Sequence, residues 1–400
     1  MTEAVKTDVL IVGGGIAGLW LCNLLQARGY QCLLLETGDL GGEQTLLSQG
    51  IIHGGLKYAL GGTLSNESEA IAAMPDRWRQ CLDGNGDIDL RGTRVLSDTQ
   101  HLWSAGSVAS RVTTFFASKM LRGRISKLPF EEFPSALRDR QFRGNVYRLA
   151  DLVVDTPSLL DTLRAPVADR LIRFDPATDR IDWQAQGVTA ATVSGVRIEP
   201  GVTVLAAGAG NEALLKAAGE HQLAADIRSQ RRPLHMALVR HTLGHRLYAH
   251  CVGASNKPRL TVTTHDLDDG SLVWYLGGDL AERGVDMNAA ELEQATRKEL
   301  LALFPWLDFS AADIRTVRVD RAEPLQDALV KPDNAYAVRR KNLVVTWPTK
   351  LTLAPDLGDR VCDLLADLPA TAPATPVPAA LPRCQVARPR WQQMFGDGHD

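Results

Sequence analysis

Thr7-Asp-Val-Leu-Ile-Val12 leads directly into Gly13-Gly14-Gly15-Ile16-Ala17-Gly18, and Gln31-Cys-Leu-Leu-Leu35 then ends on Glu36. The two short apolar runs are typical of buried parallel strands. Between them, residues 19–28 carry apolar side chains at helical spacing. A strand, a glycine-rich turn, a helix and a second strand that ends on an acid together predict a dinucleotide-binding βαβ unit.

Each residue type in this unit has a physical role. Gly13 allows the sharp turn, Gly15 lets the backbone approach a pyrophosphate, and Gly18 lets the helix pack closely on the strand. The amides at the start of the helix would hold the phosphates, and Glu36 would accept ribose hydroxyls. The alternative is an ordinary glycine-rich turn, which does not require the acid at this distance. The expected nucleotide contacts are Gly13, Gly14, Gly15, Ile16, Ala17, Gly18, Glu36 and Thr37.

Composition is that of an ordinary globular protein. A chain of 400 residues exceeds the usual size of a single domain, so two interleaved domains are expected. The formal net charge of −3 disfavours a nucleic-acid partner. Residues 1–7 lack a signal-peptide pattern, which favours a cytoplasmic location. The six cysteines are scattered without disulfide or zinc spacing, so most are expected to be buried thiols, and no metal is expected.

The rest of the chain predicts an α/β fold. We expect a capped helix from residue 155 to Leu163 and a late helix over 353–365. Short strands are expected over 171–174, 181–184, 188–196, 201–210 and 342–346. Alternating stretches at 232–240, 246–252, 259–264 and 271–276 predict an antiparallel sheet, followed by a helix over 289–303. Five prolines between residues 369 and 382 predict an extended, solvent-facing tail, with Trp391 and Phe395 as candidate anchors.

The stretch Gly41-Gly-Glu-Gln-Thr-Leu-Leu-Ser-Gln-Gly-Ile-Ile-His-Gly-Gly-Leu-Lys-Tyr58 resembles the flavin-side segment of the D-amino-acid-oxidase superfamily. Within that superfamily, Ile52-His-Gly-Gly-Leu-Lys-Tyr58 is most similar to the flavin-dependent glycerol-3-phosphate dehydrogenases, with lysine in place of arginine. Leu205–Gly210 resembles the family's central strand. Asn342–Thr352 resembles its late strand and turn, but Trp347-Pro-Thr349 replaces the family's glycines. Those residues are not expected to adopt the backbone angles of glycine, so a flavin contact there is in doubt.

The resemblance implies FAD as the cofactor, which the βαβ unit alone does not distinguish from NAD. It also implies a glutathione-reductase-type, Rossmann-like FAD domain with an interleaved antiparallel-sheet substrate domain. The FAD domain would comprise residues 1–60, 150–230 and 310–368, the substrate domain 61–149 and 231–309, and the tail 369–400. Non-covalent binding is favoured over attachment through His53. Further expected FAD contacts are Gly42, Gln44, Thr45, Ser48, Gln49, Gly50, Ile51, His53, Ile172, Ala206, Ala207, Gly208, Lys350, Leu351 and Thr352.

Three residues are candidates for the chemistry. Lys350 precedes the last long helix and could stabilise negative charge on the reduced flavin. His53 could act as a base or bond the flavin, or could be structural. Arg321 lies where an arginine of the family approaches the substrate.

Four further residues are candidates for binding the substrate: Lys57, Tyr58, Tyr248 and Trp274. Because neighbours on a strand point to opposite faces, at most one of Trp274 and Tyr275 would line the site. The histidines at 241, 245 and 250 are given no role.

The expected activity is oxidation of a C–N or C–OH bond of a small, anionic substrate by hydride transfer to flavin N5. One alternative is a glycerol-3-phosphate-like or 2-hydroxyacid dehydrogenase that passes electrons to a quinone. Another is a flavin-binding subunit or a tRNA-modifying flavoprotein. The electron acceptor is unknown, and oxygen, a quinone or a protein would fit. Val108–Leu121 is amphipathic, and a core-facing helix is favoured there over membrane contact.

Overall fold

The computed structural model describes residues 4–55, 66–104, 125–253, 257–325, 334–370 and 376–396. Its nucleotide-binding half is built on a sheet whose central strands are all parallel, in the order β9-β2-β1-β12-β19. These strands are β1 (Val5–Val12), β2 (Cys32–Glu36), β9 (Leu171–Arg173), β12 (Val196–Leu205) and β19 (Leu343–Trp347). Antiparallel additions are β10 (Arg180–Gln184), β11 (Gly187–Val193) and β18 (Tyr336–Arg340).

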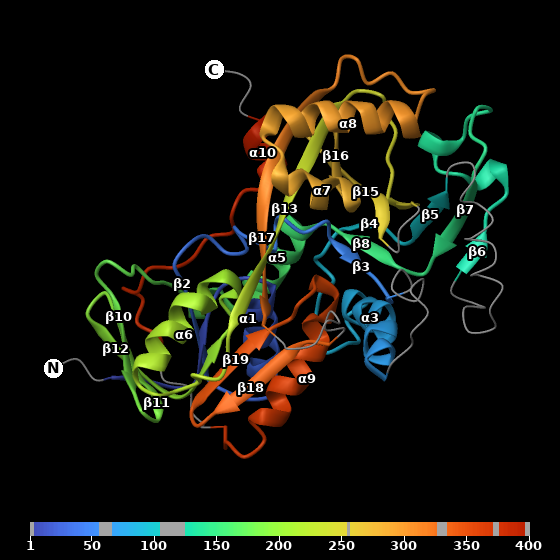
Figure 1. Ribbon diagram of the computed structural model, residues 1–400. Helices are drawn as coiled ribbons and strands as arrows, with labels where there is room; N and C mark the ends of the chain where they lie inside the picture. The colour runs from blue at the N-terminus through green and yellow to red at the C-terminus, as the bar shows by residue number, and fades with distance from the viewer. Residues whose placement is uncertain are drawn as a thin grey trace.

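Both faces of this sheet are covered, which explains why its strands are apolar throughout. Val9 and Ile11 face a core that includes α1 (Ile16–Ala27), α5 (Thr156–Arg164) and α9 (Ala354–Leu364). Leu10 faces the opposite side. A further helix, α6 (Asn211–Glu220), follows β12 (Figure 1). Because β1, β2 and β12 are parallel, their carboxyl ends lie together, and the glycine loop, Glu36 and residues 206–208 meet there.

The second large sheet has the strand order β17-β13-β16-β15-β14-β5-β7-β6, in which only the β14–β5 neighbours are parallel. We call it the substrate sheet. One face is covered by α7 (Asp279–Arg283) and α8 (Ala289–Leu303), which Figure 1 shows beside β13 and β16. Its strands are β5 (Gln100–Ser104), β6 (Ile125–Lys127), β7 (Asn145–Leu149), β13 (Ser229–His241), β14 (Ala249–Val252), β15 (Pro258–Asp266), β16 (Leu272–Gly277) and β17 (Asp313–Pro324).

A small sheet, β3 (Ile51–Ile52), β8 (Leu152–Val154) and β4 (Val95–Ser97), lies between the two large ones in Figure 1. The remaining helices are α3 (Asn66–Leu82) and α10 (Arg390–Phe395). The helix at 289–303 and the cap of α5 by Asp155 are confirmed. Most predicted strands are confirmed too, but the one predicted over 188–196 is interrupted by a turn at residues 194–195, between β11 and β12, and the one predicted over 201–210 ends at Leu205. All six cysteines are buried thiols, as expected.

Three stretches pack differently from the predicted division of the chain. α3, placed in the substrate domain by sequence, packs on the nucleotide-binding core, where the Trp78 and Trp20 ring centroids lie 5.1 Å apart. β17, placed in the FAD domain, pairs with β13 in the substrate sheet. The tail is not wholly solvent-facing, because Leu381 is buried, and the two predicted anchors, Trp391 and Phe395, are confirmed as buried. With these changes the two-domain division remains our proposal.

Candidate cofactor and substrate site

The glycine loop is packed so tightly that two of its glycines leave no room for a side chain. Gly13 has a φ of +118°, and a Cβ on it would lie 2.5 Å from the carbonyl oxygen of Ala206. A Cβ on Gly18 would lie 1.8 Å from the oxygen of Gly13. Gly15 differs, because its Cβ would meet only the Thr45 hydroxyl, at 3.2 Å. Gly13 and Gly18 therefore hold strand and helix together, whereas Gly15 keeps the N-terminus of α1 open.

The polar groups around this loop fit a dinucleotide. Helix α1 has no side chain at its N-cap, Gly15. The amide of Ile16 donates to the Thr45 hydroxyl at 3.0 Å, and the amides that follow it in the first turn would donate to phosphate oxygens. The Glu36 carboxylate accepts from the amides of Gly14 at 2.5 Å and Gly38 at 2.7 Å, which fixes an acceptor at the end of β2. These residues would hold the phosphates and the ribose.

Residues 206–208 lie against the same loop. Gly208 has a φ of +56° and accepts a hydrogen bond from the indole of Trp347 at 3.1 Å. The Asn211 side chain accepts from the amide of Ala207 and donates to the carbonyl of Thr346, both at 3.0 Å. Sequence analysis missed Asn211, which joins the ends of β12 and β19. A polar residue in the first turn after the small-residue run was its only signal.

The segment Gly41–Gly50 is attached to the substrate sheet at three points. The Gln44 Oε1 accepts from the amide of Ala322 at 3.0 Å, and the Tyr275 hydroxyl donates to the carbonyl of Leu47 at 2.9 Å. The Gln49 Nε2 donates to the carbonyl of Tyr275 at 2.8 Å. The two glutamines were predicted to contact FAD, but their side-chain amides bond the sheet. They therefore fix the segment against the substrate sheet.

The turn before Lys350 contradicts the sequence-based expectation. Thr349 has a φ of +60°, and the amide of Lys350 donates to the carbonyl of Pro348 at 2.7 Å. This is the rare positive-φ form of the γ-turn, which is strained for a β-branched residue. The Thr349 hydroxyl donates to the carbonyl of Asn334 at 3.2 Å. Of the three residues that replace the glycines, Thr349 therefore adopts a glycine-like backbone angle after all, held by surrounding contacts.

His53 and the turn at residues 350–352 are brought together. The Thr352 hydroxyl donates to the carbonyl of His53 at 3.2 Å, and its own carbonyl accepts from the Trp78 indole at 3.0 Å. The His53 imidazole is buried, and its Nδ1 accepts from the amide of Gly55 at 3.2 Å. Lys350 is half-buried and is the N-cap residue of the short helix Leu351–Leu353 that leads into α9. Two of the three predicted catalytic residues thus lie on adjoining segments.

The two substrate-binding residues predicted on the sheet, Trp274 and Tyr248, are both buried. Trp274 is wrong as a lining residue, because it is fully buried under α8, with its ring centroid 5.2 Å from that of Phe304. Its neighbour Tyr275 points to the opposite face, as strand alternation requires, and is buried there beside Leu47 of the cofactor segment. The Tyr248 hydroxyl donates to the carbonyl of Thr264 at 3.1 Å, and burial raises its pKa. Lys57 and Tyr58 lie outside the described residues.

Arg321 and Ile172 are both partly engaged within the protein. Arg321 is half-buried on β17, next to the Ala322 amide that Gln44 bonds, and its Nε donates to the carbonyl of Arg232 at 3.4 Å. The Ile172 side chain is buried in the core with Leu381, and its backbone lies between β2 and the C-terminal tail. The remaining predicted cofactor residues, Thr37, Gly42, Ser48, Gly50 and Ile51, lie on the connected loop and strand from the end of β2 to β3.

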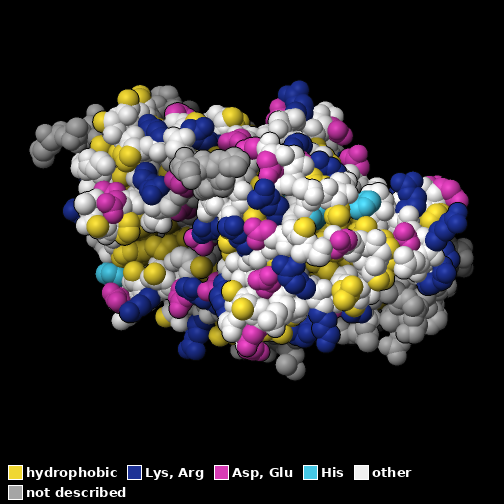
Figure 2. All heavy atoms as spheres, turned by 90° about the horizontal axis from the view of Figure 1, so that it is seen from above, with side chains coloured by type: hydrophobic (Ala, Val, Ile, Leu, Met, Phe, Trp, Pro, Cys, Tyr) yellow, Lys and Arg dark blue, Asp and Glu magenta, His cyan; other side chains and the backbone are white. Residues whose placement is uncertain are grey.

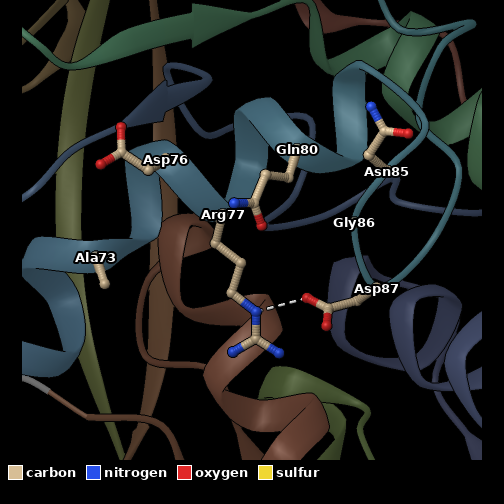
Figure 3. A pocket seen from close by; sticks show the side chains of 7 residues that line it. All are labelled: Ala73, Asp76, Arg77, Gln80, Asn85, Gly86 and Asp87. Carbon is tan, nitrogen blue, oxygen red and sulfur yellow. Dashed lines mark hydrogen bonds and ion pairs between the residues drawn. The ribbon is translucent and has the colours of Figure 1, made fainter.

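A pocket of about 600 Å³ lies elsewhere, on α3 and the loop after it. Figure 3 shows Arg77 directed toward Asp87, to which its Nε donates at 2.5 Å. The same guanidinium bonds Asp359 on α9 at 2.6 and 2.8 Å. This arginine ties α3 to α9, and none of the pocket's lining residues belongs to the glycine loop or to residues 41–54.

The surface shows both signs of charge. On the face seen in Figure 2, Lys and Arg side chains are interspersed with Asp and Glu. None of the helices in the described part of the chain is both long and apolar enough to span a bilayer. The amphipathic stretch at 108–121 lies outside the described residues.

Comparison with known proteins gives one consistent family. The family described as FAD dependent oxidoreductase (DAO) matches residues 8–346. The chain is 49% identical over 401 residues to the probable FAD-dependent oxidoreductase PA4991 of Pseudomonas aeruginosa, covering 99% of this chain and 100% of the relative. The crystal structure of that relative superposes with a TM-score of 0.84, at 44% identity over 99% of this chain and 100% of the other.

More distant similarities agree in fold. Glycine oxidase from Geobacillus kaustophilus has a TM-score of 0.64 at 16% identity, over 93% of this chain and 100% of the other. L-α-glycerophosphate oxidase from Mycoplasma pneumoniae, solved with FAD bound, has a TM-score of 0.62 at 14% identity, over 92% and 97%. One subunit of the anaerobic glycerol-3-phosphate dehydrogenase of Haemophilus influenzae is 36% identical over 65 residues, 16% of this chain and 12% of that one.

Proposed function

The chain belongs to the DAO family of FAD-dependent oxidoreductases, and from that premise we propose that it oxidises a C–N or C–OH bond of a small anionic compound. The observation that carries the proposal is the attachment of Gly41–Gly50 to the substrate sheet through Gln44, Tyr275 and Gln49. These bonds set the cofactor segment and the sheet face opposite each other. A substrate held on that face would lie against the flavin.

When bound, FAD supplies the hydride acceptor at its N5 atom. Arg321 would bind the anionic group of the substrate, because its planar guanidinium matches a carboxylate or phosphate in two parallel hydrogen bonds. Lys350, at the start of the helical turn, would place positive charge beside the pyrimidine oxygen of the ring. His53, buried and with Nδ1 accepting a backbone hydrogen bond, would present Nε2–H to the site.

Two families of substrate follow from the relatives' names. Glycine oxidase and L-amino acid deaminase name amino acids, whereas glycerophosphate oxidase names a phosphate ester. Both kinds of compound are small and carry an anionic group, a carboxylate or a phosphate, which is the chemistry that Arg321 suits. The local similarity to a glycerol-3-phosphate dehydrogenase keeps a hydroxyl substrate, with electrons passed to a quinone, as the second candidate. The cytoplasmic location expected from sequence stays a prediction.

The test is anaerobic mixing of the purified holoprotein with amino acids, 2-hydroxy acids and glycerol phosphates, followed by flavin absorbance. Bleaching by one class identifies the substrate. Arg321→Leu should then raise KM for that compound about a hundredfold, since it removes a charge-assisted bidentate contact worth a few kcal/mol. Arg321→Lys should have a smaller effect. If no compound in the three classes reduces the flavin, the proposal fails and a partner-supplied substrate becomes the better hypothesis.

A further inference from the structure

The C-terminal segment 381–396, which we call the C-terminal strap, contacts both halves of the molecule. Figure 1 shows it passing from beside β2 up to α10, against β17. At its start, Leu381 is buried in the nucleotide-binding core. The amide of Arg173 donates to the carbonyl of Pro382 at 2.9 Å, and the amide of Cys384 donates to the carbonyl of Leu171 at 3.1 Å. The strap therefore extends the edge of the parallel sheet beside β9.

The strap then bonds the beginning of the cofactor segment. The amide of Leu40 donates to the carbonyl of Gln385 at 2.7 Å, and the amide of Ala387 donates to the carbonyl of Leu40 at 3.1 Å. Leu40 itself lies against the glycine loop, since a Cβ on Gly14 would be 2.6 Å from its side chain. The next amide, of Gly41, donates to the carbonyl of Gly14 at 2.9 Å. Two residues thus separate the strap from the pyrophosphate turn.

The far end of the strap covers the part of the substrate sheet around Tyr275 and His265. The Trp391 indole stacks on the His265 ring with centroids 3.9 Å apart and an interplanar angle of 18°. It shares a hydrophobic cluster with Tyr275 and Leu47. Tyr275 is the residue whose hydroxyl holds the carbonyl of Leu47. The Arg315 guanidinium lies 5.0 Å from the Phe395 ring centroid and donates to the carbonyl of Met394, which fixes α10 to β17.

We propose that the C-terminal strap is a positioning element for FAD, with Trp391 as its key residue. It holds the cofactor segment at both ends, through Leu40 beside the glycine loop and through Tyr275 and Leu47 beneath the sheet. Without it, residues 40–50 would keep the glutamine bonds, the Tyr275 bond to Leu47 and the contacts of Gly41 and Thr45 with the glycine loop. The strap therefore adds to these contacts and limits the opening of residues 40–50.

Trp391→Ala tests the proposal in the full-length protein. We expect the dissociation constant for FAD, measured by titrating apoprotein, to rise at least tenfold. Hydrogen exchange of the amides in residues 40–50 should accelerate in the apoprotein and the holoprotein. Trp391→Phe, which keeps a ring on His265, should stay within threefold of wild type. The control is Trp306→Ala, which removes a half-buried tryptophan on the α8 side and should leave both readouts within twofold.

The other end is tested by Ala387→Pro, which removes the amide that bonds Leu40. We expect a rise of at least threefold in the dissociation constant, whereas Ala379→Pro, in an exposed turn of the same tail, should change nothing. The proposal is overturned if Trp391→Ala lowers the melting temperature as Trp306→Ala does, but leaves FAD affinity and exchange of residues 40–50 at wild-type values. In that case the strap only packs on the sheet.

Discussion

The two backbone turns that face the cofactor site solve the same problem in different ways. At the glycine loop, Gly13 takes a positive φ and Gly18 allows a close approach without a side chain in the way. At the turn before Lys350, Thr349 takes a φ of +60° with a β-branched side chain. The first turn relies on glycines, which adopt this geometry without strain. The second places a threonine in a strained conformation, which the surrounding contacts must hold.

The difference teaches where the fold relies on distant contacts. The turn of the glycine loop is formed by residues of one βαβ unit, where Gly18 packs on Gly13 and Glu36 accepts from Gly14, so most of its geometry follows from neighbouring residues. The Thr349 turn depends on Asn334, and the nearby segment 41–50 depends on the substrate sheet and on the strap. Replacing a glycine at the nucleotide end should therefore cost stability and FAD binding together. Single substitutions at the flavin end should each have a smaller effect.

Gly18→Val should have the largest effect. The new Cβ would lie 1.8 Å from the oxygen of Gly13, so helix α1 must separate from β1. We expect a loss of folding free energy of about 4 kcal/mol or more, together with loss of FAD. Denaturant unfolding and the flavin content of the purified protein measure both.

Gly219→Ala is the matched control for that change. Gly219 lies inside α6, and a Cβ there has no neighbour within 4 Å. Alanine should leave FAD binding unchanged and stabilise the helix by up to about 1 kcal/mol. If Gly18→Val, like the control, retained FAD at wild-type affinity, the glycine loop would not be the less tolerant of the two turns.

The sequence predicted the nucleotide end well because its signals are local. Strand, turn, helix and acid follow one another, and Gly13, Gly18 and Glu36 lie as expected. At the flavin end, the sequence predicted which segments take part but not how their side chains are arranged. The choice between Trp274 and Tyr275 depends on which face of β16 meets α8, and that pairing is not encoded in residues 271–276 alone. The sheet bonds of Gln44 and Gln49 likewise depend on the placement of distant strands.

The second prediction concerns His265, which lies under the strap. Burial lowers its pKa from 6.5 to about 4, with Asp155 and Asp266 opposing the shift and Arg94 adding to it. The unfolded chain therefore binds more protons between pH 6.5 and 4. The free energy of unfolding contributed by His265 is fully present above pH 6.5 and is lost, by up to ~3 kcal/mol, as the pH falls toward 4.

His265→Phe keeps a ring for Trp391 but cannot be protonated, so it should reduce the slope of unfolding free energy against pH in that window. His241, whose pKa burial also lowers to about 4, would leave part of the slope in place. His221→Phe, at an exposed position, is the control. An unchanged slope in His265→Phe would mean that the stacked histidine does not resist protonation.

Lys350→Met should slow reduction of the flavin about a hundredfold, because a positive charge is removed from the site where the ring gains negative charge. It should also make the midpoint potential of the flavin more negative. Lys350→Arg, which keeps the charge, should lie between the variant and wild type. Anaerobic stopped-flow reduction and a redox titration measure the two effects. An unchanged potential with a raised KM would instead make Lys350 a substrate-binding residue.

The smallest expected effect is that of Thr349→Gly, which tests the strain directly. Removing a β-branched side chain from a positive φ should relieve about 1–3 kcal/mol of strain in the folded state. The greater freedom of glycine in the unfolded chain should lower the free energy of unfolding by about 1 kcal/mol. We therefore expect a net gain in unfolding free energy of ~1 kcal/mol. Ser194→Gly, at a φ of +48° in the turn between β11 and β12, is the control and should leave the flavin untouched. If Thr349→Gly is destabilising, its hydrogen bond to Asn334 outweighs the strain, and the two turns differ less than their φ angles suggest.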